Sequence, residues 1–141
     1  MRAYFLTNMY ISPIQHGIQT AHCIAEMFVK YSSFKSKTQI DAVYEWATGH
    51  KTVFILNGGT GEDLREALSV IYGGEQPNGN SYPHAAFQEP SIDNALTCIG
   101  VILPENFNWT LPPLYPEIRR FEDLTYEQRV AALLSSKHLA R

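Results

Sequence analysis

The fold class is decided by the stretch TVFILNGGTGEDLREALSVIYGG, which runs from residue 52 to residue 74. Its first part, Thr52–Leu56, is a continuous β-branched and apolar run that stops at a turn-forming NGG sequence, which indicates a strand buried on both faces. The Thr60 and Asp63 pair then has the spacing of a capping box, and apolar residues continue at helical spacing until the glycines at 73 and 74. A buried strand that leads directly into an amphipathic helix is typical of an α/β protein.

The other elements are predicted in both directions from this stretch. They are a strand over 3–7, helices over 17–31 and 40–46, strands over 84–88 and 95–103, and a last helix over 126–139. This order predicts a three-layer α/β/α arrangement with a mixed sheet of about four strands. We expect residues 1–141 to form a single domain, with the Pro-rich segment 104–123 and the C-terminal helix 125–140 as an extension of it.

The expected core follows from the apolar periodicity. In the first helix, Ile18, Ala21, Ala25 and Phe28 recur at spacings of three and four residues, so this face is predicted to point inward. The full predicted core is Phe5, Ile18, Ala21, Ala25, Val53, Ile55, Leu64, Leu68, Ile99 and Val101.

The composition and net charge exclude several classes of protein. With 141 residues, 45% of them hydrophobic and 18% charged, the chain is predicted to fold as an ordinary globular domain. The net charge of −3 argues against a protein that covers nucleic acid with positive charge. No apolar run approaches the roughly 20 residues of a membrane helix, and the N-terminus lacks a signal-peptide pattern, so we expect a cytoplasmic protein without membrane partners.

No cofactor or metal is predicted. The two cysteines, Cys23 and Cys98, lie in apolar segments and are expected to be buried thiols. His16 and His22 are six residues apart, which does not place two ligands on one helical face. Phosphate-loop, serine-hydrolase elbow and zinc-protease motifs are absent from the sequence.

Two segments carry residues suited to chemistry. The first, ISPIQHGIQTAHC (11–23), places Gln15, His16, Gln19 and Thr20 where a loop enters the first helix near Gly17. Helix N-termini present unpaired N–H groups and a partial positive charge, which suit a phosphate or a carboxylate. The alternative is that these polar residues only cap the helix and that the histidines are satisfied structurally.

The second segment is AAFQEPSIDNALTCIGVIL (85–103). Glu89 follows a short strand and precedes Pro90, so its carboxylate is expected at the end of the sheet, where α/β proteins usually bind ligands. Thr97 lies inside the next strand. The alternative is a surface turn with a solvated glutamate.

Together the segments resemble the type 2 peptidyl-tRNA hydrolases over about residues 2–105. The motif HGIQTAHC is similar to the family's KGKIAAQC at the entry to the first helix: Gly17, Ala21 and Cys23 match, and His22 stands where the family has Gln. The segment FQEPSIDNALTCIGVI is similar to the family's strand, acidic turn and last strand, in which an Asp and nearby threonines line the site. A related group of short proteins, with G-I-Q-x-A-H and F-x-E-P motifs, is a closer match.

The resemblance implies hydrolysis of the ester between peptide and tRNA, or of a related nucleotide-linked ester. His16 or His22 would act as the base, Glu89 would position it, and Thr97 would donate a hydrogen bond. Gln15, Gly17, Gln19 and Thr20 would bind the substrate. We expect six residues to border one cleft at the entry to the first helix: Gln15, His16, Gln19, His22, Glu89 and Thr97. Ile18 replaces the family's lysine, so a non-catalytic module that holds a nucleotide, RNA or protein partner is the alternative. A homodimer formed through the Pro-rich and aromatic segment is also open.

Overall fold

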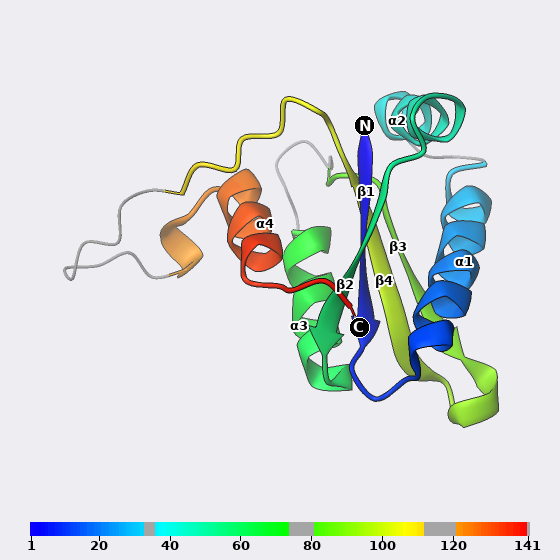
Figure 1. Cartoon of the computed structure of the whole chain (residues 1–141). Helices are drawn as coiled ribbons and strands as arrows, with labels where there is room; N and C mark the ends of the chain where they lie inside the picture. Colours follow the sequence, from blue (N-terminus) through cyan, green and yellow to red (C-terminus); the bar gives the residue numbers. More distant parts are fainter. Residues whose placement is uncertain (33–35, 74–80, 112–120, 141) are drawn as a thin grey trace.

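The computed structural model describes residues 1–32, 36–73, 81–111 and 121–140. Figure 1 shows its elements, which are β1 (Arg2–Asn8), α1 (Pro13–Lys30), α2 (Lys37–Thr48), β2 (Val53–Gly59), α3 (Gly61–Tyr72), β3 (His84–Glu89), β4 (Ala95–Leu103) and α4 (Tyr126–Ser135), with short 3-10 helices at Pro90–Ile92 and Phe121–Asp123. The order of strands and helices is the predicted one.

The four strands form a mixed sheet in the order β2-β1-β4-β3. β1 runs parallel to β2 and antiparallel to β4, and β3 is antiparallel to β4. Helices α1 and α2 pack on one face of the sheet, and α3 and α4 pack on the other (Figure 1). The predicted α/β fold with a mixed four-stranded sheet is therefore confirmed.

The central strand β1 supplies side chains to both cores. Phe5 points toward α1 and α2 and packs with Cys23 and Met27, whereas Leu6 points toward α3 and α4. This alternation is the two-residue period of a strand. Gly100, opposite Phe5 on β4, leaves the space that the Phe5 ring occupies, because a Cβ at this position would overlap the ring.

Helix boundaries agree with the predicted caps on the α3 and α4 side. Thr60 and Asp63 form a reciprocal capping box at the start of α3, and Gly73 ends that helix in the left-handed conformation with φ of 73°. Thr125 and Gln128 form the corresponding box of α4. The last helix is shorter than predicted, since it ends at Ser135.

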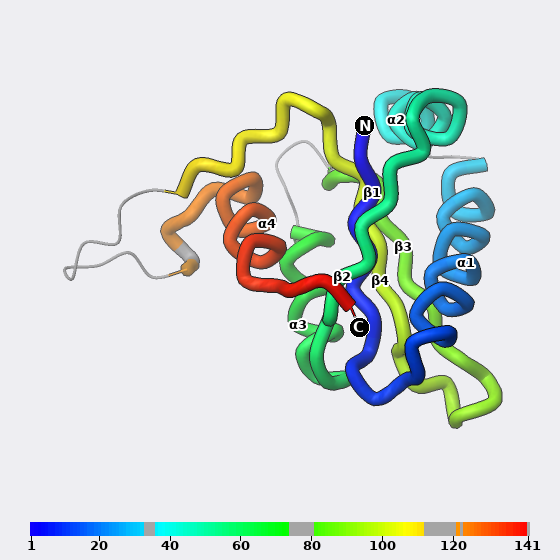
Figure 2. Tube along the Cα trace, in the orientation of Figure 1, coloured from blue at the N-terminus to red at the C-terminus, as the bar shows by residue number. Residues whose placement is uncertain are grey.

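The residues after α4 run along the outer edge of β2 instead of continuing the helix. The Asn57 N–H donates to the His138 carbonyl (2.7 Å), and the Ala140 N–H donates to the Ile55 carbonyl (2.9 Å). Figure 2 shows this C-terminal segment reaching β2. The segment therefore pairs with part of an edge strand that would otherwise be open.

Two predictions for α1 are wrong: the residue at which the helix begins and the face that is buried against the sheet. The helix begins at Pro13, one turn before Gly17, because proline is favourable at the first helical position, where no N–H is needed. Its buried residues are His16, Gln19, Thr20, Cys23 and Met27. Ile18 is 38% exposed, and Ala21 and Ala25 are exposed as well.

Of the remaining residues predicted to form the core, four are buried and three are not fully buried. Phe5, Leu64, Ile99 and Val101 are buried as expected. The expectation that β2 is buried on both faces is wrong, because β2 lies at the edge of the sheet and Val53 is exposed. Ile55 and Leu68 are only half-buried. No helix within the described residues is long and apolar enough to cross a membrane.

The Pro-rich segment is described only as far as residue 111. Phe107 is buried against the α3 and α4 side of the sheet, and Trp109 contacts the rings of Phe107 and Tyr4. The positions 112–120 of this segment lie outside the described residues. Within residues 104–111, Phe107 and Trp109 thus pack over the sheet.

Candidate functional site

A chain of polar side chains links α1 to the ends of β3 and β4. The Gln19 amide nitrogen donates to the Glu89 carboxylate (Nε2 to Oε2, 2.9 Å). On its other side, the Gln19 amide oxygen accepts from the Thr97 hydroxyl (2.7 Å). Both Gln19 and Thr97 are buried, so these bonds satisfy polar groups that would be costly to leave unpaired.

Glu89 is held by a second set of donors from the turn that follows β3. Its carboxylate caps the short helix Pro90–Ile92 and accepts from the Ser91 N–H (3.2 Å) and the Ser91 hydroxyl (2.9 Å) through Oε1. The bond from Gln19, the two from Ser91 and the nearby His22 lower the pKa of Glu89 below its usual value. Glu89 is therefore a fixed, ionised carboxylate at neutral pH.

His22 lies beside this carboxylate on the surface of α1. Its Nδ1 is 4.0 Å from Glu89 Oε2, which is ion-pair range but longer than a hydrogen bond. The imidazole packs on the Phe87 ring with centroids 4.6 Å apart, and 46% of the side chain is exposed. This arrangement places an accessible imidazole beside a carboxylate that can balance the charge of its protonated form.

Five of the eight predicted site residues thus meet at one place. Gln15 joins the chain because its amide oxygen accepts from Gln19 (3.3 Å), one turn further along α1. The five are Gln15, Gln19, His22, Glu89 and Thr97. Gln19 and Glu89 are 70 residues apart in the sequence.

The other three predicted residues lie elsewhere. His16 is buried, and its Nδ1 lies 2.6 Å from the Thr7 hydroxyl of β1, so it faces the sheet and not the pair of His22 and Glu89. Thr20 donates to the His16 carbonyl (2.7 Å) within α1. Gly17 is exposed, but it lies inside the helix and not at its N-terminus.

The predicted anion seat at Gly17 is therefore misplaced. The His16 N–H already donates to the Ser12 carbonyl (3.2 Å), so the intrahelical bonds of α1 begin ahead of Gly17. Unpaired N–H groups belong to the first turn of a helix, which here follows Ser12. The substrate-binding role expected for Gly17 and Thr20 has no support in this geometry.

Two contacting residues were missed by the sequence prediction. Phe87 supports the His22 ring, and Ser91 donates twice to Glu89. The E-P-S order offers a signal for Ser91, because a carboxylate before proline can cap the turn that the proline begins. The period of the strand alone does not indicate that Phe87 meets a histidine of α1.

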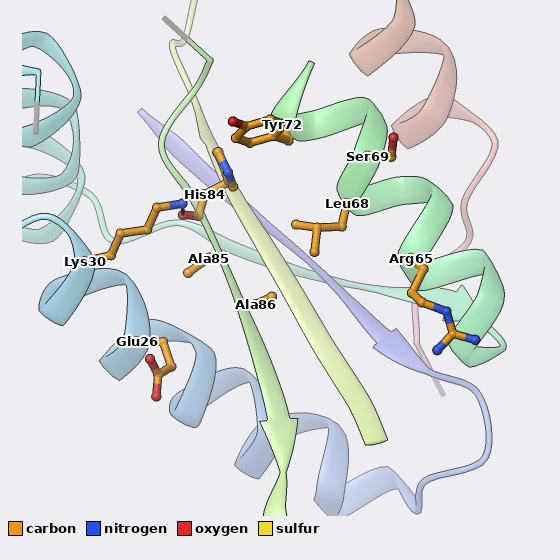
Figure 3. Close-up of a pocket in the computed structure, with 9 residues that line it drawn as sticks. All are labelled: Glu26, Lys30, Arg65, Leu68, Ser69, Tyr72, His84, Ala85 and Ala86. Atoms are coloured by element: carbon orange, nitrogen blue, oxygen red, sulfur yellow. Dashed lines mark hydrogen bonds between the residues drawn. The ribbon is translucent and has the colours of Figure 1, made fainter. Parts of the chain in front are cut away.

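A groove runs along the open edge of β3, next to this cluster. Its upper part has a volume of about 520 Å³, and its lower part about 710 Å³. Four residues line both parts: Glu26, Arg65, Leu68 and Ala86. Figure 3 shows the upper part, where α1 contributes Lys30 from one side of β3 and α3 contributes Tyr72 from the other.

The groove and the polar cluster are neighbours, but they are lined by different residues. None of the five clustered residues lines either part of the groove. The lower part is bordered by Phe87, Gln88 and Pro90, which flank Glu89 in sequence or contact His22. The groove carries two cationic side chains, Lys30 and Arg65, and two acidic ones, Glu26 and Asp93. Lys30 donates to the His84 carbonyl (2.8 Å). Of the six residues expected to border one cleft, all but His16 form a cluster, and this cluster lies beside the groove and not within it.

Comparisons with models of known protein families and with curated proteins gave no match.

Proposed function

We propose that the protein is a hydrolase that cleaves the ester between a peptide or amino acid and tRNA, or a related nucleotide-linked ester. The observation that carries the proposal is the pair of His22 and Glu89, in which an accessible imidazole lies beside a carboxylate fixed by Gln19 and Ser91. The resemblance of both segments to type 2 peptidyl-tRNA hydrolases supports the choice of substrate. Such a substrate would place the activity in the cytoplasm.

The reaction assigns a separate role to each member of the cluster. His22 takes a proton from a water molecule as the water oxygen attacks the ester carbonyl. When the bond from the carbonyl carbon to the ribose oxygen breaks, His22 returns the proton to that oxygen, which leaves a free carboxylic acid and a free ribose hydroxyl. Glu89 balances the charge of the imidazolium, and Gln19 and Thr97 act as positioning residues for Glu89.

The groove supports binding of an anionic substrate. In the upper part of the groove, Lys30 and Arg65 lie on opposite sides of β3 and outnumber the one carboxylate there, Glu26. The exposed Tyr72 ring offers a surface on which a base can stack. A substrate that lies along β3 would bring its ester toward Pro90 and Glu89. The overall negative charge then limits contact with nucleic acid to this local patch.

The test is incubation of the full chain with an N-acetylated aminoacyl-tRNA, with hydrolysis and binding measured separately. We expect His22→Ala to lower kcat/KM by roughly 10²–10⁴-fold, the usual contribution of a general base. His50→Ala is the matched control, because His50 is exposed and lies outside the cluster. Glu89→Gln should lower kcat more than it raises KM and should shift the pH dependence of kcat. Absence of hydrolysis by the wild-type chain would contradict the proposal.

A binding module of the same fold is the second candidate. The observation that favours it is Ile18, which stands at the lysine position of the similar family and points away from the sheet. In that case the chain binds uncharged tRNA or nucleotide without turnover. Exchange of Lys30 and Arg65 for Gln then weakens binding, whereas His22→Ala leaves it within about twofold of wild type, since a surface side chain outside the contact contributes little.

A further inference from the structure

The outward face of α1 is apolar, although nothing in the described structure covers it. Ile14, Ile18, Ala21, Ala25, Phe28 and Val29 recur at spacings of three, four and one residues, so they form one stripe along the helix. Ile14 is 73% exposed and Val29 is 70% exposed. Because α1 forms one outer layer of the molecule, as Figure 2 shows, this stripe is open to a partner.

The stripe has the area of the largest apolar patch on a typical monomer. Tyr44 of α2 extends it, since its ring meets the Phe28 ring edge-on with centroids 6.4 Å apart. Large apolar side chains offer on the order of 150–200 Å² each when fully exposed, so the exposed parts of Ile14, Ile18, Phe28, Val29 and Tyr44 amount to roughly 400–550 Å². The largest apolar patch on a typical monomer is about 300–600 Å² and is often functional. A standard interface buries about 800 Å² per partner and is somewhat more than half apolar, so the stripe can supply the apolar part of such an interface.

The distribution of sizes along the stripe is complementary to itself. Large side chains lie at both ends, and the small Ala21 and Ala25 lie between them. Two copies of α1 can therefore cross closely at the alanines, with the ends of each helix packed against the other. A two-fold axis at this crossing brings Ile14 of one copy toward Val29 of the other.

The charges of α1 argue against a lipid surface as the partner. Helices that bind anionic membranes carry several lysines or arginines on their polar face. Within α1, which the structure describes throughout, Lys30 is the only lysine or arginine, and the chain has a net charge of −3. From area, shape and charge together, we propose that the outward stripe of α1 is the interface of a homodimer, in which two α1 helices pack antiparallel across a two-fold axis.

The experiment measures molar mass by light scattering during size exclusion, with the full chain at concentrations above the micromolar range. The wild-type chain is expected to have the mass of two copies. A variant with Ile14→Glu and Val29→Glu places like charges at both ends of the interface, so it is expected to have the mass of one copy. The same is expected of a variant with Ile14→Lys and Val29→Lys. Because antiparallel packing brings position 14 of one copy to position 29 of the other, an equal mixture of the two variants should regain the dimer mass.

Folding is checked separately. Circular dichroism should show wild-type helix content for both variants, because positions 14 and 29 are exposed in one copy. Ile92→Glu is the matched control, since Ile92 is an exposed apolar residue in the turn after β3, and it should leave the dimer intact. A monomeric wild-type chain, or a dimer that survives Ile14→Glu with Val29→Glu, overturns the proposal. The measurement reads mass alone, so its failure is distinct from a failure of the proposed hydrolysis.

Discussion

The carboxylate of Glu89 accepts three hydrogen bonds from Gln19 and Ser91, and its ionised form is stabilised by them. Its pKa in the folded state is below the unfolded value, so the contribution to stability is present above the unfolded pKa and is lost as the pH falls through the folded pKa. We therefore expect wild type to exceed Glu89→Gln in free energy of unfolding at neutral pH, with a difference that shrinks in acid. Urea titrations of both proteins between neutral and acidic pH measure this difference.

The exposed Glu62 of α3 provides the control for that comparison. Glu62→Gln removes a carboxylate of the same type that lies outside the polar cluster. Only Glu89 accepts hydrogen bonds from Gln19 and Ser91, so the pH dependence of Glu89→Gln should differ from that of this control. Equal curves for the two variants would mean that the bonds from Gln19 and Ser91 do not favour the ionised form of Glu89.

The two thiols are predicted to be inert in the folded protein. Cys98 is fully buried, and burial, followed by the neighbouring Cys23, raises its pKa well above the usual range. Cys23 is also fully buried and contacts the Ala85 carbonyl through Sγ (3.4 Å). A colourless disulfide reagent that releases a coloured thiolate should detect neither cysteine at neutral pH, and both after unfolding in guanidinium. Rapid release from the native protein would show that this core opens readily.

At the scale of elements, α3 offers a direct test of helix orientation. Leu64 is fully buried in the core on the α3 and α4 side of the sheet, whereas Leu68, one turn later, is half-buried and lines the groove beside β3. Leu64→Ala should therefore cost about 2–5 kcal/mol of unfolding free energy through lost burial and a cavity. Leu68→Ala should cost less than about 2 kcal/mol, because its site is already partly open to water. Chemical denaturation of both variants measures the costs, and an equal loss would contradict this orientation.

Helix α1 shows why the apolar pattern of one element can mislead. The usual rule turns the apolar face of a helix toward the core. In α1 the inner face carries His16 and Gln19, whose polar groups are satisfied by Thr7 of β1 and by Thr97 and Glu89. Glu89 and Thr97 lie 70 and 78 residues from Gln19 in the sequence, so the helix sequence alone does not reveal that a face with polar residues is the buried one.

At the scale of the whole molecule, local signals predicted the order of elements and the capped helices. The capping boxes and Gly73 depend on residues three or four apart, which a sequence displays directly. The edge position of β2 depends on strand order, which no local pattern reports. The meeting of Gln19 with Glu89 was predicted because the two motifs were considered together, whereas the groove along β3 was not, since it is formed between α1 and α3.

Strand order also bears on how the chain folds during its synthesis. β1 is a central strand that pairs along one side with β4, with Arg2 opposite Leu103. At about 5–20 residues per second, a ribosome needs roughly 5–20 s between making these two partners. Throughout that interval, the side of β1 that β4 later covers has no native strand to pair with, although its apolar residues have already been made. β1 is thus made well before β4 completes its pairing, and its apolar residues stay uncovered on that side for the whole interval.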